Sequence, residues 1–140
     1  MKIVIPYKPR EHQKEVHNKL KRFNVLCCHR RWGKTTLCCN EMLKRAMQNP
    51  LLKPRYYFIS PTYSTSKRNC WDLLKTYTEV IPNVQYHETE LRCDLPNGAR
   101  IQLLGCERPD SLRGLYMDGV ILDEVAQMPP RLWTEIIRPA

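Results

Sequence analysis

The sequence predicts an α/β fold in which helices flank a mostly parallel sheet. Short apolar runs alternate along the chain with segments of helical periodicity, the order typical of a parallel sheet. Several of these runs are unbroken rather than alternating with polar residues, as in strands buried on both faces. At 140 residues, with 42% hydrophobic residues, the chain suits one domain with its own core.

Elements at residues 7–50 are expected in the order helix, strand, helix. Prolines bracket an extended start, and a helix is expected over residues 11–22, where apolar side chains recur at helical spacing. The apolar run at residues 24–28 predicts a buried strand. A loop then leads into a second helix over residues 35–48, which Asn49 and Pro50 end.

Further along the chain, the apolar run at residues 55–60 predicts a second strand, and a third helix is expected over residues 64–80. A hairpin follows, with strands at residues 90–95 and 99–104 around the turn Pro96-Asn97-Gly98, because Asn-Gly is a strong turn signal. Another buried strand is expected at residues 119–122. The last helix is expected to begin near Pro130.

Composition restricts the class of protein. Lys and Arg number 23 against 14 Asp and Glu, a formal charge of +9, which indicates a polyanionic partner or ordinary solubilising charge. No apolar run approaches the ~18 residues of a membrane span, and the start lacks a secretory signal, so we expect neither membrane insertion nor secretion. The seven cysteines include no CxxC pair and are expected to be small buried side chains in a reducing compartment.

A candidate phosphate-binding loop lies at residues 29–36, His29-Arg30-Arg31-Trp32-Gly33-Lys34-Thr35-Thr36, between the first expected strand and the second helix. Backbone N–H groups at a helix N-terminus bind phosphate oxygens. Gly33 allows close approach, Lys34 suits the β- and γ-phosphates, and Thr35 suits Mg²⁺. Cys28 replaces the first glycine of the full Walker A pattern, so a chance GKTT at a helix start is the alternative.

Two carboxylates, Asp123 and Glu124, follow the apolar run at residues 119–122. A parallel strand delivers such residues to its carboxyl end, where ligands bind in open α/β sheets. Asp123 is expected to hold Mg²⁺, usually through water, and Glu124 to polarise the water that attacks the γ-phosphate. Together with the loop, these residues predict a site for ATP and Mg²⁺.

These motifs resemble the large subunit of tailed-bacteriophage terminases, the ATPase of the DNA-packaging motor. The resemblance covers nearly the whole chain. It rests on segments 7–13, 22–35, 60–63 and 111–124, and on Pro139-Ala140. The family's variant Walker A often lacks the first glycine and carries an early arginine, which accounts for Cys28. The resemblance implies a P-loop ATPase fold of the RecA-like (ASCE) branch, with an adenine-recognition segment before the loop.

The motifs and the resemblance together assign roles to individual residues. The expected catalytic residues are Glu124, Lys34 and Arg30, and the expected metal-binding residues are Thr35 and Asp123. Arg113 is either an arginine finger acting in trans or an arginine that fixes its own loop. The expected nucleotide-binding residues are Tyr7, Gln13, His29, Arg30, Arg31, Trp32, Gly33, Lys34, Thr35 and Thr36.

Three of these assignments, and the basic residues of the third helix, leave alternatives. Gln13 either reads the adenine edge or is a solvated polar residue. Tyr7 either stacks on adenine or packs under the sheet. Trp32 is expected to pack against the loop more than to touch nucleotide. Lys67, Arg68 and Lys75 either face DNA or form a solvated charged face.

The resemblance also implies a larger protein. Residues 1–140 would be the N-terminal part of the ATPase domain, without its remainder and without the family's nuclease domain. A strand from beyond residue 140 would insert between the Walker A and Walker B strands, so we expect the chain alone not to hydrolyse ATP at a useful rate. The expected partners are double-stranded DNA, the portal protein, the small terminase subunit and further copies in a ring, at the procapsid portal in the host cytoplasm.

Two other functions are compatible with parts of the sequence. DEAD-like helicases share a glutamine segment, a Pro-Thr motif and an Asp-Glu pair, but usually read D-E-x-[HD], whereas Val125-Ala126 follows here. A non-catalytic nucleic-acid-binding remnant would explain the basic charge. Salt-dependent DNA binding without nucleotide turnover would indicate the remnant.

Overall fold

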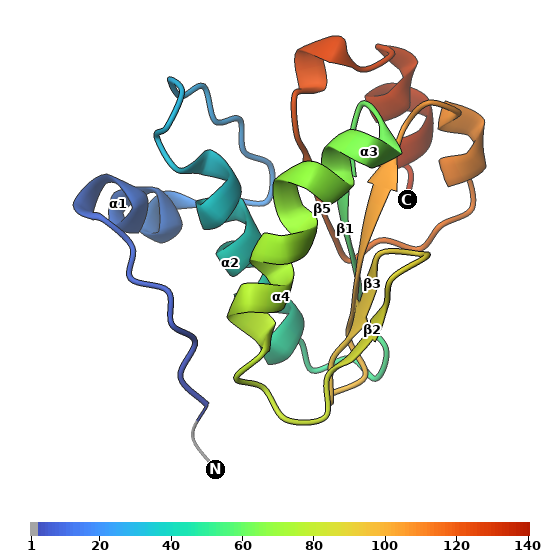
Figure 1. Ribbon diagram of the computed structural model, residues 1–140. Coiled ribbons are helices and arrows are strands. Elements are labelled where there is room, and N and C mark those ends of the chain that lie inside the picture. Colours follow the sequence, from blue (N-terminus) through green and yellow to red (C-terminus); the bar gives the residue numbers. More distant parts are fainter. Residues whose placement is uncertain (1–2) are drawn as a thin grey trace.

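A five-stranded mixed sheet forms the centre of the molecule in the computed structural model, which describes residues 3–140 (Figure 1). The strand order is β2-β3-β4-β1-β5. Strands β4, β1 and β5 are parallel, and β3 and β2 continue the sheet in antiparallel pairs. The strands are β1 (Arg55–Ser60), β2 (Gln85–His87), β3 (Arg92–Asp94), β4 (Arg100–Gly105) and β5 (Gly119–Leu122).

Helices cover both faces of this sheet. On one face lie α1 (Glu11–Lys19), α2 (Lys34–Gln48) and a helix whose middle turn is π-helical: α3 (Tyr63–Ser66), η1 (Lys67–Trp71) and α4 (Asp72–Thr78). The other face carries η2 (Pro109–Leu112) and η4 (Leu132–Ile137), and η3 (Val125–Gln127) follows β5. Within residues 3–140, no helix combines the length and the apolar character that a membrane crossing requires.

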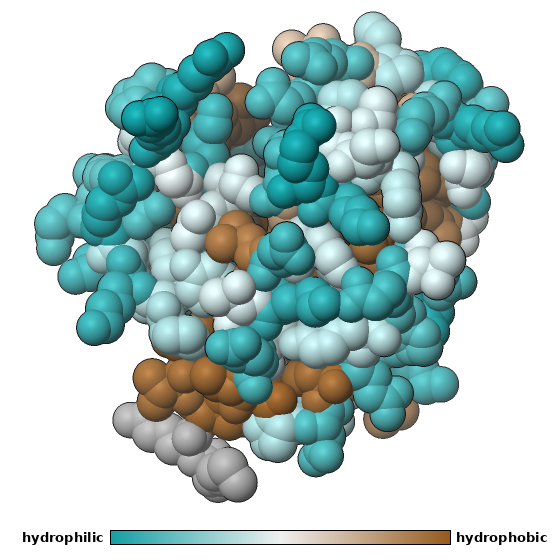
Figure 2. Space-filling view, viewed as in Figure 1, coloured by the Kyte–Doolittle hydropathy of each residue, from teal (hydrophilic) through white to brown (hydrophobic). Residues whose placement is uncertain are grey.

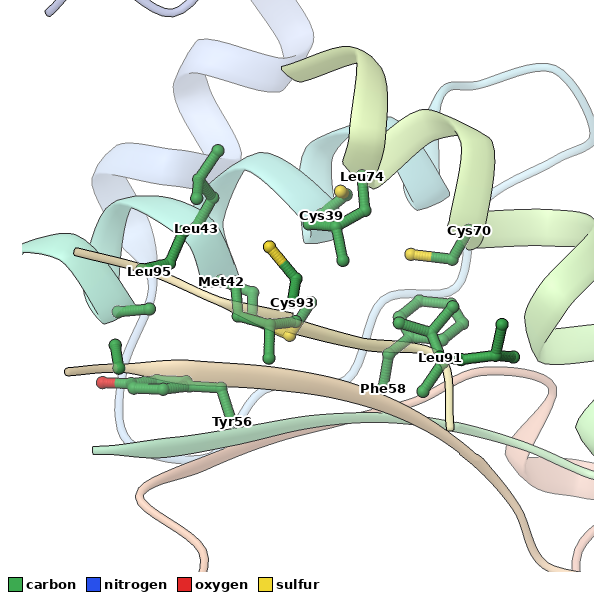
Figure 3. Close-up of a cluster of buried hydrophobic side chains, with 14 of the residues drawn as sticks. Cys39, Met42, Leu43, Tyr56, Phe58, Cys70, Leu74, Leu91, Cys93 and Leu95 are labelled. Atoms are coloured by element: carbon green, nitrogen blue, oxygen red, sulfur yellow. The ribbon is translucent and has the colours of Figure 1, made fainter. Parts of the chain in front are cut away.

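Strand β1 separates two clusters of buried side chains. Tyr56 and Phe58 point toward α2 and α4, where they meet side chains such as Met42 and Leu74 (Figure 3). Tyr57 and Ile59 pack on the other face, with residues of η2 and η4. Because both faces of β1 are covered, its sequence is an unbroken apolar run, as in buried parallel strands.

Most expected elements are present in the structure. The strands expected at residues 55–60 and 119–122 have those bounds, and the hairpin lies at Arg92–Asp94 and Arg100–Gly105. The first helix ends earlier than expected, at Lys19. The third runs from Tyr63 to Thr78 with an unexpected π-helical turn, and the last begins at Leu132. Strand β2 is too short for its pattern to be read from the sequence.

The strand expected at residues 24–28 is wrong: this segment joins no strand of the sheet. The reason is the absence of a partner, since a strand needs a neighbour for its backbone N–H and C=O groups. The outer edge of β5 is likewise without a partner strand in the described chain. The loop at residues 29–33 therefore follows an irregular segment instead of a strand.

Candidate functional site

The loop before α2 has the backbone geometry of a phosphate-binding loop. Arg31 and Gly33 have left-handed backbones, with φ of 61° and 94°. A Cβ on Gly33 would lie 2.5 Å from Gln13 Nε2 and 2.7 Å from Arg10 Nη2, so this position needs glycine both for its φ and for space. No side chain caps α2, which leaves its first backbone N–H groups free to bind an anion.

Lys34 lies at the first position of α2, and its side chain reaches back across the loop. Its Nζ donates to the backbone oxygen of Cys28 at 3.0 Å. The ammonium group is therefore held on the inner side of the loop, where the uncapped N–H groups of α2 begin. Thr35 and Thr36, the next two residues, are half-buried.

Three residues near the start of α1 hold the loop by its carbonyl groups. Gln13 Nε2 donates to Gly33 O at 3.1 Å, and Gln13 Oε1 accepts from Arg10 N at 2.9 Å. Arg10 Nη2 donates to Trp32 O at 2.5 Å, and His12 Nε2 contacts the same oxygen at 3.1 Å. Sequence reasoning identified Gln13 but missed the loop contacts of Arg10 and His12, because nothing in their spacing indicates them.

Gln13 is a buried anchor, only 4% exposed, rather than a solvated residue. Its carboxamide still has unused capacity, because an amide nitrogen carries two hydrogens and an amide oxygen two lone pairs. One N–H and one lone pair remain beyond the two bonds to Gly33 and Arg10. Adenine recognition by Gln13 therefore stays a prediction that is compatible with the loop contact.

Tyr7 lies in a packed position between α1, α2 and α4. Its hydroxyl contacts His17 Nε2 at 2.8 Å, and His17 Nδ1 lies 2.9 Å from Glu41 Oε2. Its ring meets that of Tyr77 edge-on, and burial raises the pKa of Tyr7 to about 12. These contacts match the packing alternative, and stacking on adenine stays a prediction.

The tip of the loop carries the exposed residues His29, Arg30 and Arg31. His29 Nδ1 contacts Arg30 O at 2.7 Å. Within residues 3–140, no carboxylate pairs with either arginine. Both guanidinium groups are therefore unoccupied by acidic neighbours. The ring of Trp32 packs edge-on against His12, with centroids 4.6 Å apart, as expected for a loop-packing residue.

Asp123 directly follows β5, at the same edge of the sheet as the loop. Its N–H donates to Ile59 O at 2.9 Å, which continues the β1–β5 pairing by one residue. Burial raises the pKa of the Asp123 carboxyl, and a hydrogen bond from Asn69 and the charge of Lys34 oppose that rise. Asn69 Nδ2 donates to Asp123 Oδ2 at 3.4 Å, a contact that sequence reasoning missed.

Glu124 follows in a left-handed conformation, with φ of 56°, and its side chain is exposed. This turn separates the two carboxylates: Asp123 is half-buried against the helices, and Glu124 faces solvent at the end of the strand. A general base needs such access to water, whereas a metal-binding carboxylate needs a fixed position.

The donor set fits Mg²⁺ bound with a nucleotide. Mg²⁺ prefers oxygen donors, keeps several waters and commonly uses one or two protein groups plus phosphates. A Thr35 hydroxyl and an Asp123 carboxylate supply that chemistry. Among the described residues there is no cluster of three or more His, Cys, Asp or Glu side chains arranged to hold a metal, so this site needs phosphate oxygens to complete it.

Arg113 lies in a charged network away from the loop. Its Nε donates to Asp110 Oδ1 at 2.9 Å, and its Nη2 donates to Glu135 Oε2 at 3.3 Å. Arg131 donates to both oxygens of Asp110, at 3.1 and 3.3 Å. These contacts match the loop-fixing alternative for Arg113, and its role in trans stays a prediction.

The cysteines are free thiols of mixed burial. Cys39, Cys70, Cys93 and Cys106 are buried, as expected, whereas Cys27 is exposed. Burial also raises the pKa of Cys38 to about 12, so this thiol beside the site is not a nucleophile near neutral pH.

Known proteins match this chain in sequence and in fold. The family model for the terminase large subunit, T4likevirus-type, N-terminal, matches residues 29–137. Terminase large subunits of Thermus phage G20c and Thermus virus P23-45 are each 28% identical over 155 residues, covering 97% of this chain and 32% of the relative. The chain thus spans about a third of the length of these relatives.

Solved structures give the same result. The large terminase ATPase domain of Thermus phage P74-26 superposes with a TM-score of 0.80 at 27% identity, over 96% of this chain and 61% of that one. The large terminase of a thermophilic bacteriophage, solved in complex with ADP, has a TM-score of 0.64 at 20% identity, over 78% and 28%. The second likeness concerns the fold alone.

Proposed function

Because the chain belongs to the terminase large subunit family, T4likevirus type, N-terminal, we propose that it forms the ATP-binding and hydrolysing part of a phage DNA-packaging motor. One observation carries the proposal. The uncapped N-terminus of α2, with Lys34, and the acidic pair after β5 lie at one edge of the sheet, and the charge of Lys34 acts on Asp123. The likeness to the P74-26 ATPase domain supports the same conclusion.

In this proposal the loop binds the phosphates of ATP. The first backbone N–H groups of α2 bind phosphate oxygens, and Lys34 exchanges its bond with Cys28 O for the β- and γ-phosphates. Arg30 adds a cationic contact in cis from the tip of the loop. A spare N–H and a spare lone pair of Gln13 are available to the adenine edge.

Thr35 and Asp123 hold Mg²⁺, which neutralises charge that develops on the β- and γ-phosphates. Glu124 accepts the proton of the attacking water at its exposed carboxylate. Arg113 acts on the γ-phosphate of a neighbouring subunit, which requires it to leave Asp110 and Glu135. Arg131 can satisfy Asp110 when that happens, because it already donates to both carboxylate oxygens.

We propose further that residues 1–140 are the N-terminal part of a longer ATPase domain. The free edge of β5 and the unpaired segment at residues 24–28 leave room in the sheet for one more strand between them. Such a strand would set the spacing between Lys34 and Glu124, so we expect residues 1–140 alone to hydrolyse ATP far more slowly than the complete polypeptide. Equal turnover by the two would contradict this.

The partners follow from the family: double-stranded DNA, the portal protein, the small terminase subunit and further copies in a ring, in the host cytoplasm. The charge of +9 and the exposed Lys67 and Arg68 support a DNA-backbone contact. Lys75 is less available, because it pairs with Glu88. We expect the complete polypeptide to bind DNA with a steep salt dependence and little sequence preference.

The other two functions are weaker. The DEAD-like helicase interpretation lacks the residue after Asp-Glu that such helicases use, and the family match favours the terminase. A non-catalytic remnant would bind DNA without nucleotide turnover. ATP hydrolysis by the complete polypeptide separates the remnant from both ATPases.

The decisive test is ATPase activity of the complete polypeptide with Lys34→Ala. We expect turnover to be abolished, because no other residue of the loop can place an ammonium between the β- and γ-phosphates. Lys44→Ala is the matched control, since Lys44 is an exposed lysine of the same helix. Near-native turnover in Lys34→Ala would rule out this phosphate site.

A further inference from the structure

A small polar cluster lies beside Asp123 at the carboxyl ends of β1 and β5. Phe58 pairs with Ile121 across the two strands, and both belong to the cluster under α2 and α4. Side chains alternate along a strand, so residues two positions further on face the same side. Ser60 and Asp123 therefore lie next to each other on that face, under the helix that carries Asn69.

Asn69 lies in η1, the π-helical turn between α3 and α4. Such turns interrupt an otherwise regular helix and are frequent at functional sites. The next two residues, Cys70 and Trp71, are buried in the core, which fixes the turn against the sheet. From this position Asn69 Nδ2 donates to Asp123 Oδ2 at 3.4 Å.

Ser60 is fully buried, and its hydroxyl has no hydrogen-bond partner anywhere in residues 3–140. A buried hydroxyl without a partner destabilises a fold, so such groups call for a reason other than packing. The backbone of Ser60 is in use, because Cys106 N donates to its oxygen at 3.1 Å. The side chain alone is unoccupied, and its neighbour across the strands is Asp123.

We propose that Asn69 and Ser60 are positioning residues that orient the Asp123 carboxylate toward Mg²⁺ bound with the nucleotide. This rests on the proposed function. Asn69 holds Oδ2, whereas no described residue bonds Oδ1, which remains available on the side of the loop. The Ser60 hydroxyl donates to the carboxylate once metal binding turns it. Groups that orient a metal ligand commonly change metal affinity 10–100-fold when they are removed.

The first test compares ADP binding by the complete polypeptide in Mg²⁺ and in EDTA. For Asn69→Ala we expect about tenfold weaker binding in Mg²⁺ and native affinity in EDTA. The matched control is Asn18→Ala, the same substitution at an exposed position of α1. Binding of Mn²⁺ with ADP, followed by electron paramagnetic resonance, should show the same loss. Equal losses in Mg²⁺ and EDTA, or no loss, would overturn the role of Asn69.

The second test uses Ser60→Ala, with Ser64→Ala as the control at an exposed position of α3. Removing an unpartnered hydroxyl should leave the unfolding temperature unchanged or raise it, while Mg²⁺-dependent ADP affinity falls several-fold. A lower unfolding temperature with unchanged Mg²⁺ dependence would assign Ser60 to packing. If the native protein itself bound ADP equally in Mg²⁺ and EDTA, the proposed function would fail, whatever the variants did.

Discussion

The two flanks of β1 differ in how completely they are paired. On the β4 side, register runs from Arg55 opposite Arg100 to Ser60 opposite Gly105, and β3 and β2 extend the sheet further. On the β5 side, pairing begins only at Tyr56 opposite Gly119, and within residues 3–140 no strand lies beyond β5. One flank is therefore a finished sheet, and the other has a free edge.

Burial follows the same division. Ile101 and Leu103 of β4 are fully buried, whereas every residue of β5 is only half-buried. Polar side chains cover much of the face that carries α1, α2 and α4, and apolar ones gather at the lower edge of the view (Figure 2). The proposed chemistry lies at the less buried flank, with Asp123, Glu124 and the phosphate loop. Stability and chemistry are thus assigned to different sides of one strand.

If this division holds, substitutions on the β5 side change activity far more than stability, and substitutions on the β4 side do the reverse. Arg113, in the segment leading to β5, gives the largest expected effect. For Arg113→Ala in the assembled protein we expect ATP hydrolysis to fall by about 10³–10⁵-fold, with ATP affinity retained. Its ion pairs are largely exposed, so the free energy of unfolding should change little.

Steady-state ATPase assays and nucleotide titrations measure this effect. Arg131→Ala serves as the control, because Arg131 shares Asp110 with Arg113. Unchanged hydrolysis in Arg113→Ala would mean that the arginine only fixes its loop, as its present contacts alone would indicate.

The acidic pair sharpens the comparison within the β5 side. Glu124→Gln keeps the shape of the side chain but loses the base, so ATP should bind while hydrolysis falls by ~10²–10⁴-fold. Asp123→Asn should instead weaken the Mg²⁺-dependent part of ATP binding. Glu79→Gln, an exposed glutamate after α4, is the control. Equal loss of binding in both variants would refute this division of roles.

The β4 side should respond in stability instead. For Leu103→Ala, which empties a fully buried position, we expect the free energy of unfolding to fall by about 2–5 kcal/mol. Val25→Ala, in the unpaired segment where the side chain is 84% exposed, should change it by less than about 0.5 kcal/mol. Urea unfolding measures both. Similar losses would mean that residues 24–28 are packed as tightly as β4.

The sequence predicted those parts of the fold that depend on local pattern. Strands at residues 55–60 and 119–122 were readable as unbroken apolar runs, and the hairpin from its Asn97-Gly98 turn, where Gly98 has φ of 91°. The segment at residues 24–28 has the same apolar pattern, yet it is no strand, because strand formation also requires a neighbour. Pattern reports the capacity to pair, not the presence of a partner.

The candidate site was predictable to a similar extent. The loop and the acidic pair follow from motifs, and the structure brings both to one sheet edge. The contacts of Gln13 with Gly33 and of Asn69 with Asp123 did not follow from any motif, because they depend on how α1 docks and on the π-helical turn. The free Ser60 hydroxyl is visible only once strand register and burial are known.

The most direct test of the account is hydrogen exchange of the complete polypeptide, with and without ADP and Mg²⁺. The account predicts slower exchange at residues 29–36 and 119–124 when the nucleotide binds. Exchange at residues 100–105 should not change, because β4 is already paired on both sides. No change at residues 29–36, or an equal change at residues 100–105, would contradict the claim that the nucleotide binds at the loop beside β5.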